Sequence, residues 1–302
     1  MDNPVRTLLY IFSVYFCLSV PFAIAADKTL KTDEPQQDEQ PESRYDTRYF
    51  ILKPHKRNYI LPITATDNFN EQAYAEVPQF ADNFEDIEAK YQISLKFPLL
   101  NEGFLFKQDS LHFGISLQSW WQIYADNISK PFRETNYQPE IFYRVKTPWK
   151  LLDGNITLGV GVEHQSNGRS QLLSRSWNRM YGEVIFQKTD FKATFKPWYR
   201  LPENEKRSPE DSEGDDNPDI RDYMGNYQVE FEYLWGDVGM DIMLRENFST
   251  HKGAFELGLT FPIWSGLRGY LQYFNGYGES LIDYNHNQQK VGLGIMLDTY
   301  FN

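Results

Sequence analysis

Residues 254–261, AFELGLTF, alternate between large apolar side chains and small or polar ones. Successive side chains of an extended strand point to opposite faces of a sheet, so this stretch predicts a strand with one apolar face. The same alternation recurs over residues 223–233 and 291–297. Beyond residue 55, no segment has a sustained helical period of 3.6 residues. The chain is therefore predicted to be all-β.

The composition separates a membrane barrel from most other classes of protein. The chain has 302 residues and a formal net charge of −12, which argues against a nucleic-acid binder because such proteins need a basic face. Hydrophobic residues make up 41% of the chain, too few for a bundle of apolar transmembrane helices, yet aromatic residues reach 16%. A transmembrane β-barrel has this composition because only alternate residues face lipid. A soluble β-sandwich alternates in the same way, so the alternation alone leaves that class open.

The N-terminus has the features of an export signal. Residues 7–26 are the only long apolar run, preceded by Arg6 and closed by the small residues that a signal peptidase accepts, Ala23-Ile24-Ala25. Residues 1–25 are therefore predicted to be a signal peptide, with a retained membrane anchor as the alternative. The only cysteine, Cys17, lies in this run, so the exported protein would contain no disulfide. These features favour a multi-pass β-barrel in the outer membrane of a Gram-negative bacterium.

Two regions are predicted behind the signal peptide. Residues 26–55 form an acidic arm that is expected to be disordered, because it has too few apolar side chains to offset the entropy of ordering. Residues 56–302 form the barrel domain, a 12-stranded antiparallel transmembrane β-barrel with the even strand number of closed bacterial barrels. The strands are predicted at 57–65, 88–98, 110–124, 138–147, 155–166, 177–187, 190–200, 222–235, 237–247, 253–262, 266–275 and 289–300. The longest polar connection, 202–221, is expected to be an extracellular loop.

Three polar residues in 155–187 lie at the end of an apolar stripe. His164 and Ser166 continue the face of Ile156, Leu158, Val160 and Val162, and Asn178 shares a face with Met180 on the next strand. Residues two apart on a strand are same-face neighbours about 6.7 Å apart at Cα. A symmetric hairpin also places Asn178 directly opposite His164, with Cβ atoms about 5 Å apart. All three side chains should therefore point outward together.

This arrangement has the parts that acyl transfer needs. A hydroxyl lies on one side of an imidazole and a carboxamide on the other, which matches a nucleophile, a base and a group that orients the base. An asparagine orients the imidazole without placing a charge beside lipid. The alternative is that these are interfacial polar residues that mark where the barrel leaves the membrane.

Four segments, spread in order over most of the barrel, carry a resemblance to a known family. They are SKPFRETNYQPE at 129–140, HQSNGRSQLLSRSWNR at 164–179, DDNPDIRDYMG at 215–225 and GYGESLIDYNHNQ at 276–288. Together they resemble the outer membrane phospholipase A family. The resemblance implies hydrolysis of the acyl esters of glycerophospholipids, at either position, and of lysophospholipids. By matching positions, Ser166 would be the nucleophile, His164 the general base and acid, and Asn178 the group that orients His164.

The resemblance also implies a calcium ion and a homodimer, with dimerisation as the activating step. Ca²⁺ would contact Ser174 and the main-chain carbonyl of Arg169, with Ser129 supplied across the dimer and Asp216 at a further calcium-associated position. The main-chain N–H of Gly168 would contribute to the oxyanion hole. Many family members have an aspartate after the Gly-Arg-Ser triplet, whereas this chain has Gln171. That difference puts a calcium site within the monomer in question, but not a site shared by the dimer.

The remaining polar and aromatic features have structural interpretations. Trp120 and Trp121 are adjacent, so one should face lipid and the other the lumen. Arg133, Glu134, Glu279 and Asp283 are expected to form ion pairs in the lumen or at its rim and to plug a narrow barrel. The leading prediction is thus a calcium-dependent phospholipase A1/A2 of the outer membrane. The alternatives are a non-catalytic outer membrane barrel, serving as a narrow channel or adhesion protein, and an acyl hydrolase that acts on lipid A.

Overall fold

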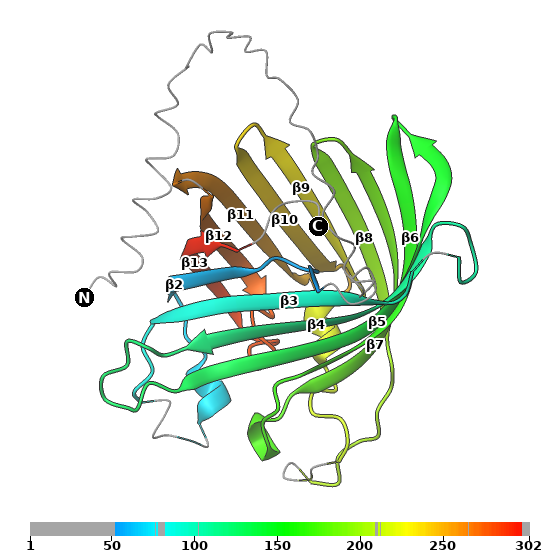
Figure 1. Ribbon diagram of the computed structural model, residues 1–302. Helices are drawn as coiled ribbons and strands as arrows, with labels where there is room; N and C mark the ends of the chain where they lie inside the picture. Colours follow the sequence, from blue (N-terminus) through cyan, green and yellow to red (C-terminus); the bar gives the residue numbers. More distant parts are fainter. Residues whose placement is uncertain are drawn as a thin grey trace, which may run out of the picture. The chain divides into compact units, whose positions relative to one another are not determined.

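The computed structural model describes residues 52–75, 77, 82–101, 103–208, 211, 213–264 and 266–297. Twelve antiparallel strands, β2 to β13, follow one another around a barrel, and each pairs with its neighbours along the chain (Figure 1). The last strand pairs with the first, from Lys290 opposite Thr66 to Met296 opposite Tyr59, and this pairing closes the barrel. The predicted fold class, a 12-stranded antiparallel barrel, is confirmed.

The strands lie close to their predicted places. Their bounds are β2 Tyr59–Thr66, β3 Ile87–Asn101, β4 Asp109–Trp121, β5 Phe132–Leu151, β6 Gly154–Ser166, β7 Ser176–Lys188, β8 Phe191–Arg200, β9 Tyr227–Trp235, β10 Val238–Asn247, β11 Lys252–Trp264, β12 Leu267–Tyr277 and β13 Asn287–Met296. The predicted signal peptide and most of the predicted acidic arm lie outside the described residues. At the end of that arm, β1 Lys53–Pro54 pairs with β3 and so lies against the barrel.

The two largest errors in the predicted strand boundaries are at strand starts. Residues 222–224 belong to a short helix, α3 Ile220–Met224, and the strand begins only at Tyr227. The helix buries Ile220 and Met224, one turn apart, in a cluster with Trp177 and Trp198, and this packing overrides the alternation of the sequence. Strand β5 begins at Phe132 rather than at 138, so most of the PFRETNY segment is part of the sheet.

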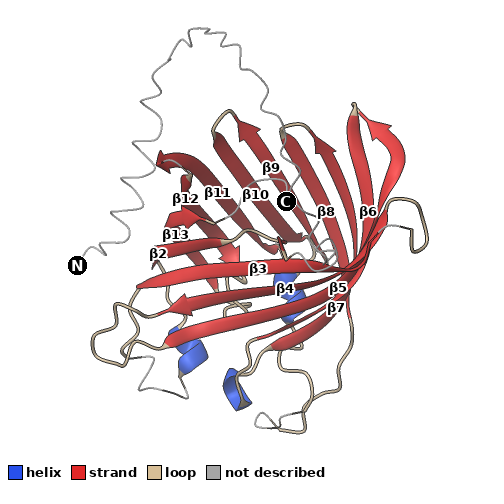
Figure 2. Ribbon diagram, in the orientation of Figure 1, coloured by secondary structure: helices blue, strands red, loops and turns tan. Residues whose placement is uncertain are grey.

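Three short helical segments lie in loops at one end of the barrel (Figure 2). They are η2 Glu71–Tyr74, η3 Gln171–Leu173 and α3. In a closed meander, alternate connections lie at the same end, so the β2–β3, β4–β5, β6–β7, β8–β9, β10–β11 and β12–β13 loops gather there. None of the helices in the described part of the chain is long and apolar enough to cross a membrane.

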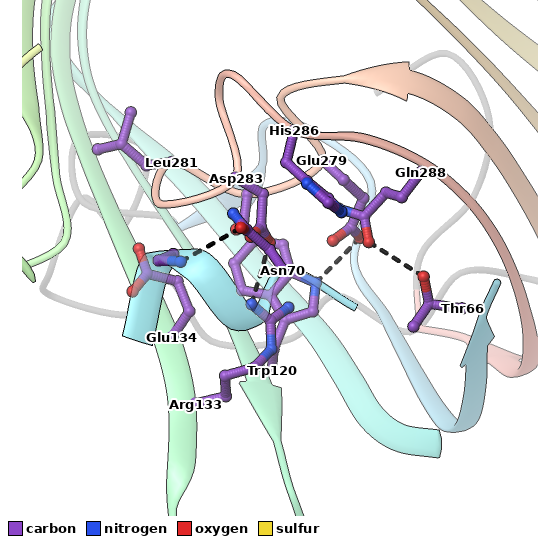
Figure 3. Close-up of polar contacts among 12 residues, drawn as sticks. Thr66, Asn70, Trp120, Arg133, Glu134, Glu279, Leu281, Asp283, His286 and Gln288 are labelled. Atoms are coloured by element: carbon purple, nitrogen blue, oxygen red, sulfur yellow. Dashed lines mark hydrogen bonds and ion pairs between the residues drawn. The ribbon is translucent and has the colours of Figure 1, made fainter. Parts of the chain in front are cut away.

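The lumen near this end holds a network of buried charges (Figure 3). The guanidinium of Arg133 pairs with Glu88 at 2.9 Å and with Asp283 at 3.0 Å. Glu279 accepts from Lys90 at 2.7 Å and from Lys290 at 3.1 Å. The predicted lumen ion pairs of Arg133, Glu279 and Asp283 are present. Such a network lets charged side chains fill a narrow barrel because each charge has a partner of opposite sign.

The residues next to this network show which side chains face the lumen and which face outward. Glu134 departs from the prediction, since among the described residues it has no recorded ion pair. It accepts hydrogen bonds from two amide groups, the shorter of them from Asn136 at 2.6 Å. Trp120 is fully buried and donates to Glu279 in the lumen, whereas Trp121 stacks on Phe132 and is only partly buried. One tryptophan of the pair thus faces inward and the other outward, as predicted.

Candidate active site

Strands β6 and β7 carry the three residues predicted to be catalytic. Their register pairs His164 with Asn178 and Ser166 with Ser176, which is the pairing expected of a symmetric hairpin. The loop between the strands, residues 167–175, contains η3. Because a strict register fixes which face each residue occupies, His164 and Asn178 point to the same side of the sheet.

That side is the lipid-facing wall of the barrel. Val160 and Met180, which share the face of His164 and Asn178, are 58% and 52% exposed. The alternate residues Glu163 and Arg179 are buried and form an ion pair in the lumen. The outward stripe predicted from the alternation is therefore present, and the polar residues lie at its end.

His164 and Asn178 are joined by a hydrogen bond. The Nδ1 atom of His164 lies 2.9 Å from Oδ1 of Asn178. An amide oxygen can only accept, so Nδ1 must carry the hydrogen, and the Nε2 lone pair is left free to accept a proton. Ser166 lies two residues along the same strand face, and the described residues include no hydrogen bond between its hydroxyl and His164. Catalytic hydrogen bonds often tighten only when substrate is bound.

A glutamate from another loop contacts the far side of the asparagine. Asn178 donates from Nδ2 to Oε1 of Glu203 at 3.3 Å. Burial, followed by the nearby carboxylates of Asp215 and Asp216, raises the pKa of Glu203. Glu203 was not predicted from the sequence, because it lies in the β8–β9 connection, where no periodic pattern relates a residue to the strands.

The loop after Ser166 is held in shape by Asn167. This residue is buried, and its Oδ1 accepts from the main-chain N–H groups of Arg169 at 3.2 Å and Arg175 at 3.0 Å. Its Nδ2 donates to the carbonyl of Leu173 at 2.8 Å. Sequence reasoning missed this role, although an Asn-Gly pair is a turn signal in which the asparagine side chain commonly bonds nearby backbone.

Gly168 sits at the turn that follows Asn167. Its φ is +63°, a conformation that residues with a side chain adopt only at a cost. An added Cβ would also lie 3.4 Å from the ring of Tyr137. A glycine at this place lets the main chain turn directly beside the nucleophile position.

Two of the predicted calcium-associated residues, Ser174 and Asp216, lie in contact. Asp216 accepts through Oδ2 from Ser174 Oγ at 2.8 Å and from Ser176 Oγ at 3.2 Å. Its other oxygen pairs with Lys206 Nζ at 2.5 Å, and both side chains of this pair are mostly buried. The β6–β7 and β8–β9 loops thus meet beside the candidate nucleophile, and Lys206 was not anticipated from the sequence.

The other two predicted ligands are further apart in the fold. The side chain of Arg169 donates to the carbonyls of Phe132 and Arg133 at 2.9 and 2.8 Å, which ties its loop to the start of β5. Ser129 is exposed in the β4–β5 loop, and within the described residues it has no recorded contact with Ser174. Nor do those residues hold a group of three or more His, Cys, Asp or Glu side chains placed to bind a metal.

A shallow groove of about 260 Å³ runs beside His164 and Asn178 on the outer wall. Its outward-facing lining is apolar and includes Phe113, Ile141, Val162 and Leu201. An acyl chain could therefore lie against the wall with its ester group near the three polar side chains.

A closed membrane barrel with such a constellation on its outer wall defines a class, the outer membrane ester hydrolases. The chain belongs to the Phospholipase A1 family, whose family model matches residues 36–297. It is 40% identical over 253 residues to Phospholipase A1 of Escherichia coli K12, covering 83% of each chain. It is 39% identical over 253 residues to Phospholipase A1 of Klebsiella pneumoniae, covering 83% of this chain and 84% of the relative.

Solved structures agree with this assignment. The barrel resembles outer membrane phospholipase A from Escherichia coli with a TM-score of 0.75 and 40% identity, covering 83% of this chain and all of the other. It resembles the calcium-bound dimer of the Salmonella typhi outer membrane phospholipase with a TM-score of 0.76 and 37% identity, covering 85% of this chain and 96% of the other. The chain is therefore a phospholipase of the outer membrane of a Gram-negative bacterium.

Proposed function

We propose that this phospholipase is calcium-dependent, is active as a homodimer, and uses Ser166, His164 and Asn178 to cleave acyl esters at either position of glycerophospholipids and in lysophospholipids. The observation that carries this proposal is the 2.9 Å hydrogen bond between His164 Nδ1 and Asn178 Oδ1, two residues from Ser166 on the lipid-facing side. The open groove supports a broad specificity, because a wall binds an acyl chain without enclosing the rest of the lipid.

The first half of the reaction forms an acyl-enzyme. Ser166 Oγ attacks the ester carbonyl carbon while His164 Nε2 takes the hydroxyl proton. Asn178 Oδ1 holds Nδ1–H and stabilises the imidazolium. The main-chain N–H of Gly168 donates to the oxyanion of the tetrahedral intermediate. The carbon–oxygen bond to the glycerol then breaks, and His164 returns the proton to the departing alcohol.

The second half releases the fatty acid. Water attacks the acyl carbonyl, and His164 accepts the water proton. The bond to Ser166 Oγ breaks, and His164 gives the proton back to the serine. The free enzyme and a fatty acid result.

The oxygen donors near Ser174 fit a hard cation in part. Ser174 offers a hydroxyl and Arg169 a main-chain carbonyl in one loop, and Ca²⁺ prefers such oxygens. A bound calcium ion would add positive charge beside the oxyanion. Asp216 fits less well, because Lys206 already neutralises it. Because position 171 is a glutamine and not a carboxylate, the candidate calcium ligands of one chain carry little negative charge.

This shortage of charged ligands within one chain supports a calcium site that two subunits share. Ser129 is exposed at the same end of the barrel, where a second copy could reach it, and the Salmonella typhi relative is a calcium-bound dimer. We propose that the partner subunit's Ser129 completes the oxygen set, so that dimerisation switches the enzyme on.

The test is acyl release from a short-chain phosphatidylcholine and from lysophosphatidylcholine by the full chain refolded in detergent. Label in one or the other acyl chain distinguishes the two positions. We expect release in calcium, none in excess EDTA, and a loss of about 10³-fold or more in kcat/KM for Ser166→Ala. Ser170→Ala, an exposed serine of the same loop, is the matched control and should keep its activity.

Each element of the proposal can fail separately. Release that survives EDTA contradicts the calcium requirement, and activity in Ser166→Ala contradicts the nucleophile. Full activity in a protein that crosslinking shows to be monomeric contradicts activation by dimerisation. No release by folded dimer would favour the non-catalytic barrel.

A further inference from the structure

The amide of Asn178 has two chemically opposite ends, and which end faces His164 decides the chemistry. With Oδ1 toward His164, the imidazole carries its hydrogen on Nδ1 and has a free Nε2. With the amide turned over, Nδ2 would face Nδ1, which would then have to accept. The hydrogen of a neutral imidazole would move to Nε2, and His164 could no longer take a proton from Ser166.

Glu203 favours one of these two orientations. Its Oε1 lies 3.3 Å from Nδ2 of Asn178. An ionised carboxylate has only acceptors, so it forms a hydrogen bond with Nδ2 and repels Oδ1. A turned amide would lose its hydrogen bond to Glu203 and would set two acceptors, Oδ1 of Asn178 and the carboxylate, against each other.

The loop that carries Glu203 is anchored on both sides of it. Leu201 N–H donates to the carbonyl of Asn178 at 2.9 Å, which sets the distance between this loop and β7. On the other side, the carbonyl of Asn204 accepts from Asp215 N–H at 2.7 Å. Arg200, next to Leu201, pairs with Asp215 at 2.5 Å. Glu203 thus lies in a fixed position between two main-chain contacts.

We propose that Glu203 is a positioning residue of this phospholipase: its carboxylate fixes the orientation of the Asn178 amide and thereby the Nδ1–H form of His164. The proposal rests on the triad assigned above and deepens it. Glu203 also adds a negative charge two hydrogen bonds from the imidazole, just beyond the lipid-facing wall. The other charged groups around it are Arg200, Asp215, Asp216 and Lys206, the last of which is paired with Asp216.

The experiment compares Glu203→Ala, Glu203→Gln and the control Glu205→Ala, an exposed glutamate two residues along the loop. In Glu203→Ala we expect kcat to fall about tenfold to a hundredfold with KM little changed, since a wrong tautomer costs catalysis rather than binding. Glu203→Gln replaces the carboxylate by an amide that can either accept from Nδ2 or donate to Oδ1 of Asn178, so it should recover kcat only in part. In both variants the acidic limb of kcat/KM should move to lower pH, because a negative charge near the imidazolium is lost. Glu205→Ala should match the unmodified chain.

A second readout does not depend on activity. Nitrogen-15 NMR of the histidine rings in calcium-free, detergent-refolded protein reports which ring nitrogen of His164 carries the hydrogen. We expect Nδ1–H in the unmodified chain, and a mixture of the two neutral forms in Glu203→Ala and in Glu203→Gln. Unchanged kcat in Glu203→Ala would overturn the proposal, as would a loss of kcat in that variant while His164 keeps its hydrogen on Nδ1.

The two proposals fail in different ways. If the unmodified chain is inactive and Ser166 is not labelled by a serine-directed sulfonyl fluoride, the triad assignment fails. If it is active and labelled but Glu203→Ala behaves like Glu205→Ala, only the role of Glu203 fails.

Discussion

At position 178, a neutral amide joins two hydrogen bonds of opposite sense. It accepts from His164 and donates to Glu203, at 2.9 and 3.3 Å. An aspartate, the usual residue at this place in serine hydrolases, could accept from His164 but could not donate. The identity of residue 178 is therefore tied to the presence of a carboxylate behind it.

This dependence predicts the behaviour of an aspartate variant. Asn178→Asp should lower kcat by about tenfold or more, because two carboxylates in contact repel each other and one must take up a proton or move away. Adding Glu203→Gln supplies a donor again and should restore much of the loss. Steady-state kinetics of the single and double variants tests this coupling. If the double variant loses as much kcat as Asn178→Asp alone, the two positions act independently.

Residue roles were predictable only where a regular pattern related them. A period of two puts His164 and Ser166 on one face, and a symmetric hairpin puts Asn178 opposite His164, so their placement could be inferred from the sequence. Glu203 and Lys206 lie in a polar loop without period, and their partners, Asn178 and Asp216, lie 25 and 10 residues from them. Only the folded chain brings these groups together.

At the scale of elements, the β8–β9 loop supplies a positive charge where a calcium-associated position was predicted. Lys206 and Asp216 form a mostly buried ion pair, and Ser174 donates to the same carboxylate. A buried carboxylate that loses its partner typically costs about 3–5 kcal/mol. The Lys206 ammonium therefore neutralises the Asp216 carboxylate within this chain.

Removing this ammonium should make the loop responsive to calcium. Lys206→Met is expected to lower the midpoint of thermal unfolding in EDTA, and millimolar calcium should restore it. The unmodified monomer should gain less from calcium, because Lys206 already neutralises Asp216. Differential scanning calorimetry in detergent measures both shifts, with Lys206→Met/Asp216→Asn as the control that should not respond. A larger calcium shift in the unmodified chain than in Lys206→Met would contradict this expectation.

The errors in the predicted elements have a common physical origin. Tyr223 and Gly225 continue the alternation of β9, yet Ile220 and Met224 fold into a helix because the end of the barrel offers a buried cluster to one helical face. The early start of β5 was missed because Arg133 and Asn136 are buried polar residues with partners in distant parts of the chain, the carboxylate of Asp283 and the main-chain N–H of Leu281. An alternating sequence predicts the strands that form the membrane-facing wall. It does not predict how helices and buried polar residues pack at the end of the barrel.

At the scale of the whole molecule, balanced charges occupy the lumen near the end of the barrel that carries the site. Three cations, Lys90, Arg133 and Lys290, meet three anions, Glu88, Glu279 and Asp283. The network connects strands β3, β5 and β13 with the β12–β13 loop. The interior of the barrel thus depends on carboxylates that remain ionised.

The network predicts a loss of stability in acid. Burial disfavours ionisation of Glu279, but Lys290 and Lys90 outweigh it and hold the pKa of Glu279 below its usual range. Arg133 likewise outweighs burial and lowers the pKa of Asp283. A carboxyl group whose pKa is lowered by folding stabilises the folded state above its unfolded pKa, about 4, and this stabilisation is lost as pH falls through the folded value.

Urea unfolding followed by tryptophan fluorescence between pH 7 and pH 3 should therefore show a plateau and then a decline below about pH 4. Glu279→Gln should lower the plateau and make the decline shallower. Stability that rises on acidification through this range would show that burial, and not ion pairing, dominates these groups.

The position of Ser166 on the outer wall has a consequence for how the enzyme meets its substrate. Because the groove lies on the outer wall, a lipid reaches the site by lateral diffusion within its own leaflet and not from water. The quantity that sets the rate is then the mole fraction of ester lipid in the surface around the barrel. Inert detergent added to mixed micelles at constant total substrate would slow turnover by surface dilution alone.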